Sequence, residues 1–193
     1  YGPVFNGVDE KGDPKFKDLN GDGKIESAGL DRQVLGNGLP TITLGLNNTF
    51  NAGNWSLNFF FRGAFGHSLV NQYRVFYEDY NAGSIKNYNR ILTKLSDPKI
   101  KNAQYSSIHV EKADFLRLDN LQLGYNLPMT GAFSKAFIYL AGNNLFTITN
   151  YSGIDPEVRF VDDETGNPLA PGIDRRTNYF TSRSFSLGLT LGF

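Results

Sequence analysis

The chain has 193 residues, which is enough for one ordinary domain with a buried core. Its 19 lysines and arginines balance 19 aspartates and glutamates, so net charge gives no case for binding nucleic acid. Cysteine is absent, which excludes disulfides, thiolate metal sites and a cysteine nucleophile. A 14% aromatic content and 21 glycines favour β structure.

Residues 1–40 precede the first predicted strand. Within this segment, the stretch DLNGDGKIESAGLD at 18–31 is typical of an EF-hand-type calcium loop, with oxygen-bearing side chains at alternate positions and a glycine at the sharp turn. Position twelve, where a bidentate acid is needed, is Gly29, so Asp31 or Glu26 would have to close the loop. The other interpretation is an Asx-rich turn without metal. The candidate calcium ligands are Asp18, Asn20, Asp22, Lys24 through its carbonyl, Glu26 and Asp31.

Five later segments alternate apolar with small or polar residues, as strands with one apolar face do. The last is the clearest, because Phe185, Leu187, Leu189 and Leu191 alternate with serine, glycine and threonine up to Phe193. No apolar run approaches the roughly 20 residues of a transmembrane helix. The predicted strands cover residues 41–50, 54–66, 114–127, 136–149 and 183–193.

The connections between these strands alternate in length. Short turns join the first strand to the second and the third to the fourth, whereas the other two connections are long. Outer-membrane barrels show this alternation of short periplasmic turns and long external loops. If the chain ends at the periplasmic side, both long connections and residues 1–40 are extracellular.

The predicted fold class is therefore all-β, an antiparallel transmembrane β-barrel fragment, with residues 41–193 as barrel strands after the extracellular segment 1–40. One face would meet lipid and the other a polar lumen. Five strands are too few to close such a barrel, so we expect the remainder upstream; the start at Tyr1, without a signal peptide, also indicates a beginning in mid-protein. Phe193 is a candidate C-terminal assembly signal. The alternative is a soluble β-sandwich with one face on a core.

The first long connection is rich in aromatic residues. Exposed aromatics can stack on sugars or contact a partner protein, and they can also pack the connection against itself. The candidate substrate or lid contacts are Tyr73, Phe76, Tyr77, Tyr80 and Tyr88. Arg62, on the polar side of the second strand, is expected to pair with a plug inside the barrel. No nucleophile elbow, histidine pair or phosphate-binding glycine loop is present, so we expect no enzyme activity.

Several stretches together resemble the SusC/RagA family of TonB-dependent outer-membrane transporters. They occur in the family's order and cover roughly half of the chain. The stretches are GDPKFKDLNGDGKI (12–25), DRQVLGNGLPTITLGLN (31–47), NWSLNFFFRGAFG (54–66), DFLRLDNLQLGYNLP (114–128), GNNLFTITNYSGIDPE (142–157) and the terminal RSFSLGLTLGF.

The resemblance implies that the chain supplies the last strands of a 22-stranded barrel with an amino-terminal plug, in the outer membrane of a Gram-negative bacterium. It further implies a SusD-like surface lipoprotein as a lid, and TonB-driven import of oligosaccharides or peptides through contacts made by the missing amino-terminal part. The rival hypotheses are a soluble calcium-stabilised β-sandwich for adhesion or glycan binding, a passive porin and a secreted hydrolase.

Overall fold

The structure, a computed structural model, describes residues 1–26, 29–78, 91–128, 133–157, 172–176 and 178–192. The chain divides into two compact units, each built from segments that are far apart in the sequence. The first unit contains Tyr1–Thr41, Gly66–Asp114 and Asn150–Tyr179, and the second contains Ile42–Phe65, Phe115–Thr149 and Phe180–Phe193.

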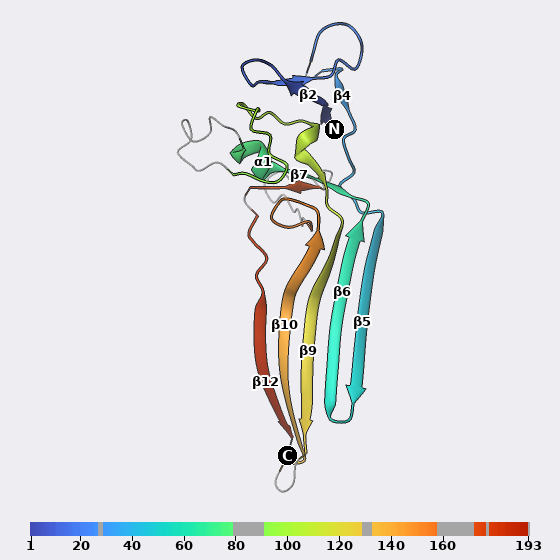
Figure 1. Cartoon of the computed structure of the whole chain (residues 1–193). Helices are drawn as coiled ribbons and strands as arrows, with labels where there is room; N and C mark the ends of the chain where they lie inside the picture. The colour runs from blue at the N-terminus through green and yellow to red at the C-terminus, as the bar shows by residue number, and fades with distance from the viewer. Residues whose placement is uncertain (27–28, 79–90, 129–132, 158–171, 177, 193) are drawn as a thin grey trace, which may run out of the picture. The chain divides into compact units, whose positions relative to one another are not determined.

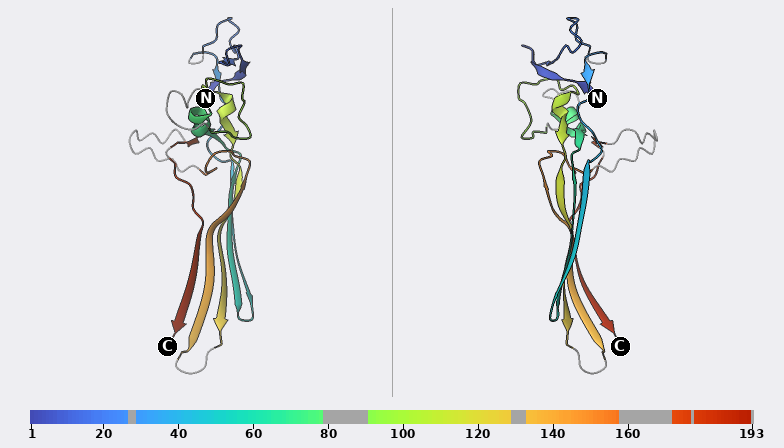
Figure 2. Two further views of the ribbon diagram at one scale, coloured as in Figure 1. Left: turned by 60° about the vertical axis from the view of Figure 1, so that its left-hand side comes forward. Right: turned by 90° about the vertical axis from the view of Figure 1, so that its right-hand side faces the viewer.

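The second unit is one antiparallel sheet of five strands in the order β12-β10-β9-β6-β5 (Figure 1). The rotated views of Figure 2 show the same strands side by side in a twisted layer. The strands are β5 (Ile42–Ala52), β6 (Trp55–Phe65), β9 (Phe115–Leu127), β10 (Lys135–Thr149) and β12 (Ser184–Gly192).

Each of these strands begins and ends within two residues of its predicted range. They contain 11, 11, 13, 15 and 9 residues, and a tilted membrane strand needs about 9–11. The tight turn between β5 and β6 closes at Gly53, whose φ of 58° suits a residue without a β-carbon. The all-β class and the open antiparallel sheet predicted from the sequence are confirmed.

The strand pairing is irregular at two places, and both lie opposite residues 118–120 of β9. The pairing of β6 with β9 shifts between Phe60 and Phe61, and that of β10 with β9 shifts between Asn143 and Phe146. Asn144 has φ 52°, the left-handed region that asparagine tolerates better than most residues. These bulges keep apolar residues on the same face above and below the shift.

The first unit is more folded than the long connections suggested. Its largest sheet has the order β11-β7-β8, with β7 parallel to β11 and antiparallel to β8. A short helix, α1, begins after Asn71, whose side chain accepts a hydrogen bond from the Arg74 amide at 3.2 Å. The elements are β1 (Gly2–Pro3), β2 (Phe5–Val8), β3 (Pro14–Phe16), β4 (Arg32–Gln33), β7 (Ser68–Asn71), α1 (Gln72–Tyr77), η1 (Ser107–His109), β8 (Val110–Lys112) and β11 (Ile173–Asp174).

This grouping differs from the predicted division of the chain at residue 40, because residues 66–114 and 150–179 cluster with residues 1–41. An extracellular position for residues 1–40 stays a prediction. None of the helices in the described residues has the length and apolar character needed to cross a membrane.

Candidate functional site

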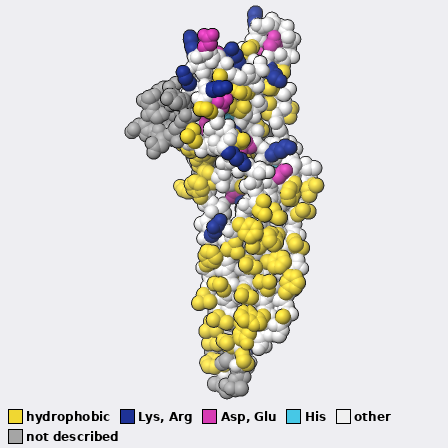
Figure 3. All heavy atoms as spheres, viewed as in Figure 1, with side chains coloured by type: hydrophobic (Ala, Val, Ile, Leu, Met, Phe, Trp, Pro, Cys, Tyr) yellow, Lys and Arg dark blue, Asp and Glu magenta, His cyan; other side chains and the backbone are white. Residues whose placement is uncertain are grey.

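One face of the five-stranded sheet is apolar across its whole width. The cross-strand register places Leu187, Leu140, Leu123, Leu57 and Phe50 opposite one another in one row. Although apolar, Leu187 and Phe50 expose 75% and 57% of their surface. Figure 3 shows the yellow side chains spread over these strands. Such a continuous exposed face needs an apolar medium or partner to cover it.

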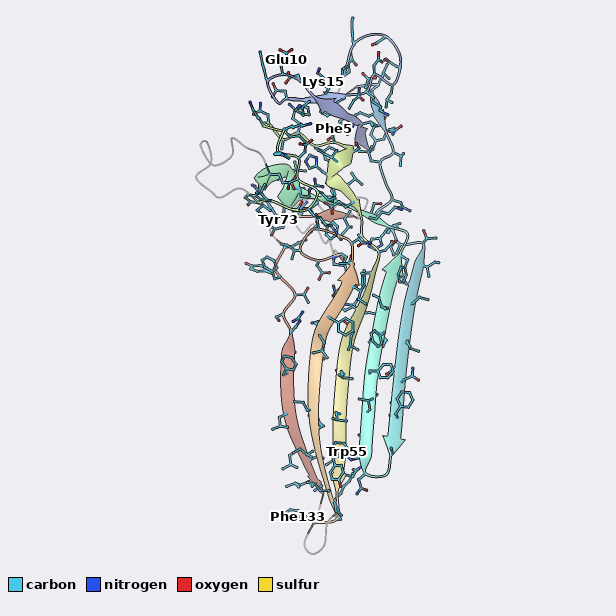
Figure 4. All side chains as sticks on the ribbon, viewed as in Figure 1. Phe5, Glu10, Lys15, Trp55, Tyr73 and Phe133 are labelled. Carbon is cyan, nitrogen blue, oxygen red and sulfur yellow. The ribbon has the colours of Figure 1, made fainter. Side chains whose placement is uncertain are left out.

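An aromatic pair lies at the turn end of this face. The rings of Trp55 and Tyr125 are direct cross-strand neighbours with centroids 4.7 Å apart, and Figure 4 places Trp55 beside the β5–β6 turn. Tryptophan and tyrosine are enriched where a membrane meets water, because their rings are apolar with a polar edge. The pair therefore fits one boundary of a lipid-facing band.

The opposite face is polar, and its side chains bond to one another across the strands. Asn120 donates to Asn143 at 2.9 Å, and Asn143 donates to Ser184 at 3.2 Å. Arg62 in β6 forms an ion pair with Asp119 in β9. The sequence-based expectation paired Arg62 with a plug; the structure gives it a partner within the sheet.

Aromatic rings on the polar face lie over glycines of neighbouring strands. The Phe137 and Tyr139 rings have centroids 5.8 Å apart and are stacked. A β-carbon added to Gly124 would lie 2.2 Å from Phe137, and one added to Gly188 would lie 2.2 Å from Tyr139. Because these glycines have no β-carbon, the rings can lie directly against the neighbouring strands.

The calcium-like motif folds into a series of side-chain-capped turns. Both Asp18 carboxylate oxygens accept backbone hydrogen bonds, from Gly21 at 2.7 Å and Gly23 at 2.9 Å. Asn20 accepts one from the Asp22 amide at 3.1 Å, and Asp22 accepts one from the Lys24 amide at 2.8 Å. This pattern is that of the Asx-rich turn considered as the alternative.

Asp31 closes this loop. It is fully buried, and it accepts hydrogen bonds from the backbone amides of Glu26 and Leu19 at 2.8 and 2.7 Å. These bonds hold the pKa of Asp31 below its usual range, so it remains charged. Within the part of the chain that the structure describes, no three His, Cys, Asp or Glu side chains are placed to hold a metal ion. Calcium binding stays a prediction.

The aromatic residues of α1 make contacts within the first unit. The Tyr73 hydroxyl donates to the backbone carbonyl of Arg176 at 2.8 Å, and the Arg176 guanidinium lies 4.6 Å from the Phe76 ring centre. Tyr73 and Tyr77 also pair, with centroids 5.8 Å apart. Their role in substrate or lid contact stays a prediction. Tyr80, Tyr88 and Phe193, the other predicted contacts and the assembly signal, lie outside the described residues.

A buried ionic network, which the sequence reasoning missed, organises the first unit. Arg74 is only 1% exposed, and its guanidinium bonds Glu78 at 2.8 Å and Glu111 at 3.0 Å. Glu111 also accepts hydrogen bonds from Asn71 at 3.2 Å and from the Ser152 amide at 2.9 Å. The spacing of Arg74 and Glu78 is a helical ion-pair signal that could have revealed part of this network.

Three other buried groups of this unit have displaced pKa values. Burial, followed by the positive charge of Arg74, lowers the pKa of His109 to about 4. Tyr151 donates to the Asp174 carboxylate at 2.8 Å, and burial followed by that carboxylate raises the pKa of Tyr151. Burial also raises the pKa of Asp174, against the hydrogen bonds from Asn178 and Tyr151. These groups hold the unit together through paired polar contacts.

The curated relatives of the chain are TonB-dependent receptors. It is 31% identical to TonB-dependent receptor P3 of Formosa agariphila, over 98% of this chain and 20% of that protein. It is 28% identical to TonB-dependent receptor SusC of Bacteroides thetaiotaomicron, over 96% of this chain and 18% of that protein. The chain thus spans about a fifth of the length of the curated relatives it matches. No family model matches it.

Solved structures give the same result. The RagAB peptide importer in the closed-closed state matches with a TM-score of 0.74 and 25% identity, over 100% of this chain and 22% of that one. The structure of the RagAB peptide transporter matches with a TM-score of 0.72 and 24% identity, likewise over 100% and 22%, which supports the fold alone. Together with the apolar and polar faces of the sheet, these matches show that the chain is similar to a β-barrel segment of TonB-dependent receptors. More particularly, the chain is SusC/RagA-like, which confirms the resemblance found in the sequence.

Proposed function

We propose that the chain is one segment of a longer outer-membrane polypeptide that imports nutrients across the outer membrane of a Gram-negative bacterium. The observation that carries this proposal is the five-stranded sheet, which has one exposed apolar face and one polar face whose side chains form hydrogen bonds with one another. In a membrane, only a closed sheet satisfies every backbone group, so the edges at β5 and β12 would pair with further strands of the same barrel. The relatives, which are receptors and transporters, support a transport role without catalysis.

Lipid would contact the apolar face, while the remainder of the barrel and a plug would complete the structure. A TonB complex would provide energy through a part of the polypeptide outside this segment, and a SusD-like lipoprotein would cover the barrel. The names of the relatives support TonB dependence, and SusC and RagAB as neighbours support a lipoprotein partner of this kind.

The cargo would be peptides or oligosaccharides, and peptides are the better-supported class. The neighbour that covers the whole chain at 25% identity is described as a peptide importer.

Uptake measurements with the full-length gene would test this proposal. Cells should take up fluorescent peptides when the gene is present and TonB is intact, and should lose uptake when either is deleted. Uptake that persists without TonB would indicate a passive porin instead. Labelled oligosaccharides in a parallel assay would decide the cargo, and recovery of the protein in the soluble fraction would contradict the membrane location.

A further inference from the structure

A hollow in the first unit lies on one face of the β11-β7-β8 sheet. Along β7, Leu69 and Asn71 are buried, while the alternate residues Ser68 and Val70 line the hollow. Val70 pairs with Ile173 of β11 on one side and with Val110 of β8 on the other. The floor is therefore a row of three branched aliphatic side chains across three strands. We call this hollow the β7 pocket.

Glycine backbone and polar side chains form the walls of the β7 pocket. A β-carbon on Gly36 would lie 2.8 Å from the Ser68 side chain, and one on Gly172 would lie 2.6 Å from the Gly38 backbone. Larger residues would therefore force these walls apart. The pocket has a volume of about 390 Å³ and is also lined by Tyr1, Leu35, Gln72 and Tyr105. Binding sites for small molecules begin at about 300 Å³, so this pocket suits a small group.

The chemistry of the lining favours an apolar group with polar atoms at its edge. A sugar ring placed on Ile173, Val70 and Val110 would bury hydroxyl groups against side chains that offer no hydrogen bond, which is unfavourable. A branched or aromatic side chain would instead exchange water for apolar contact. The Ser68 hydroxyl, the Gln72 amide and the backbone of the glycine walls are suited to peptide groups beside such a side chain.

We propose that the β7 pocket is a subsite for an apolar side chain of a peptide cargo. This inference rests on the proposed transport function and adds a position and a side-chain preference to it. Among the residues that the structure describes, the side chains that line the pocket are uncharged, so recognition at this subsite depends on side-chain size and polarity rather than on charge.

Binding of defined tripeptides to the purified full-length protein in detergent tests the proposal. Calorimetry should show Ala-Leu-Ala binding at least about tenfold more tightly than Ala-Ser-Ala, because only the former fills the apolar floor. Val110→Phe fills the pocket and should reduce the affinity for Ala-Leu-Ala to that for Ala-Ser-Ala. Val110→Ala enlarges the pocket and should shift the preference towards Ala-Trp-Ala, an effect that simple misfolding would not produce.

Val34→Phe is the matched control, since Val34 is 75% exposed, is outside the lining and belongs to the same unit. It should leave all affinities unchanged.

Equal affinities for the leucine and serine peptides, or no binding of either, would overturn the proposal, as would an unchanged preference in both Val110 variants. Maltotriose binding that Val110→Phe abolishes would assign the pocket to sugars instead. TonB-dependent peptide uptake that persists unchanged in Val110→Phe cells would reject the subsite while leaving the transport function intact.

Discussion

The Tyr139 ring in β10 lies against Gly188, its direct cross-strand neighbour in β12. A β-carbon on Gly188 would come within 2.2 Å of a ring carbon, closer than side chains approach one another. Glycine at position 188 thus allows the last strand to pair closely with β10 while an aromatic ring covers the contact. The small residues that alternate along β12 therefore have a packing role in addition to their polarity.

Replacement of this glycine should weaken the sheet. In the full-length protein, Gly188→Val forces the Tyr139 ring away from the strand, and overpacking of this kind costs about 1–3 kcal/mol. The urea midpoint of the folded barrel, followed by tryptophan fluorescence, should fall accordingly. Gly45→Val is the matched control, because a β-carbon there would meet Phe60 at an ordinary 3.5 Å. An equal loss of stability in both variants would contradict the specific role of the ring.

A positive charge should reduce folding of the barrel more on the apolar face of β12 than on its polar face. Leu187→Arg places a cation in the apolar face, which costs about 2–4 kcal/mol if lipid covers that face. Ser186→Arg places the same charge on the polar face and should be better tolerated. The measurement is the fraction of full-length protein that runs as folded barrel in unheated gels of outer membranes. Better folding of the Leu187 variant than of the Ser186 variant would show that the apolar face does not meet lipid.

Acid should destabilise the first unit through His109. Its folded pKa of about 4 lies below the ordinary histidine pKa of 6.5, so the unfolded chain binds the proton more readily. The contribution of His109 to the free energy of unfolding is then fully present above about pH 6.5. It falls by about 3 kcal/mol as the pH decreases towards 4. Asp174, with its raised pKa, acts in the opposite direction, because its protonation favours the folded state.

Hydrogen exchange of the peptide that covers η1 in the full-length protein provides the measurement. Exchange should accelerate between pH 6.5 and 4 after correction for the intrinsic rate. His109→Gln should flatten this response, since the neutral amide does not titrate. A variant that keeps the full pH response would assign the effect to another group.

The Arg74 network should be required for the order of the first unit. Arg74→Met leaves Glu78 and Glu111 as buried charges without their guanidinium, and breaking a buried ion pair in this way costs about 3–5 kcal/mol. We expect faster limited proteolysis between residues 66 and 114. Lys99→Met, at an exposed lysine of the same unit, is the control and should change the rate little. Equal resistance of the Arg74 variant and the parent protein would show that the network is dispensable.

Calcium binding at residues 18–31 is the remaining prediction. If the Asx-rich loop holds calcium, titration of the full-length protein should give binding heat that Asp22→Ala removes, and a chelator should destabilise only the parent protein. The Asp22 carboxylate lies exposed in the loop, so its removal should not disturb a core. The absence of calcium heat, with equal stability of both proteins in chelator, would establish the loop as a hydrogen-bonded turn alone.

The sequence by itself determined the five strands and their two faces. Alternation is a local property, because successive side chains in a strand point to opposite sides whatever the neighbours are. Leu187 and Ser186 could therefore be assigned to different faces before any pairing was known. The short turn at Gly53 likewise made β5 and β6 antiparallel neighbours.

The tertiary structure decided which groups from distant segments meet. Arg62 pairs with Asp119, 57 residues away, and Arg74 pairs with Glu111, 37 residues away. It also decided that residues 66–114 and 150–179 fold with residues 1–41, where the sequence indicated only long connections. These contacts depend on the path of the chain between the strands, which alternation along a single strand does not record. Alternation along a strand determines which face a side chain occupies, whereas long-range packing determines which residue that side chain contacts.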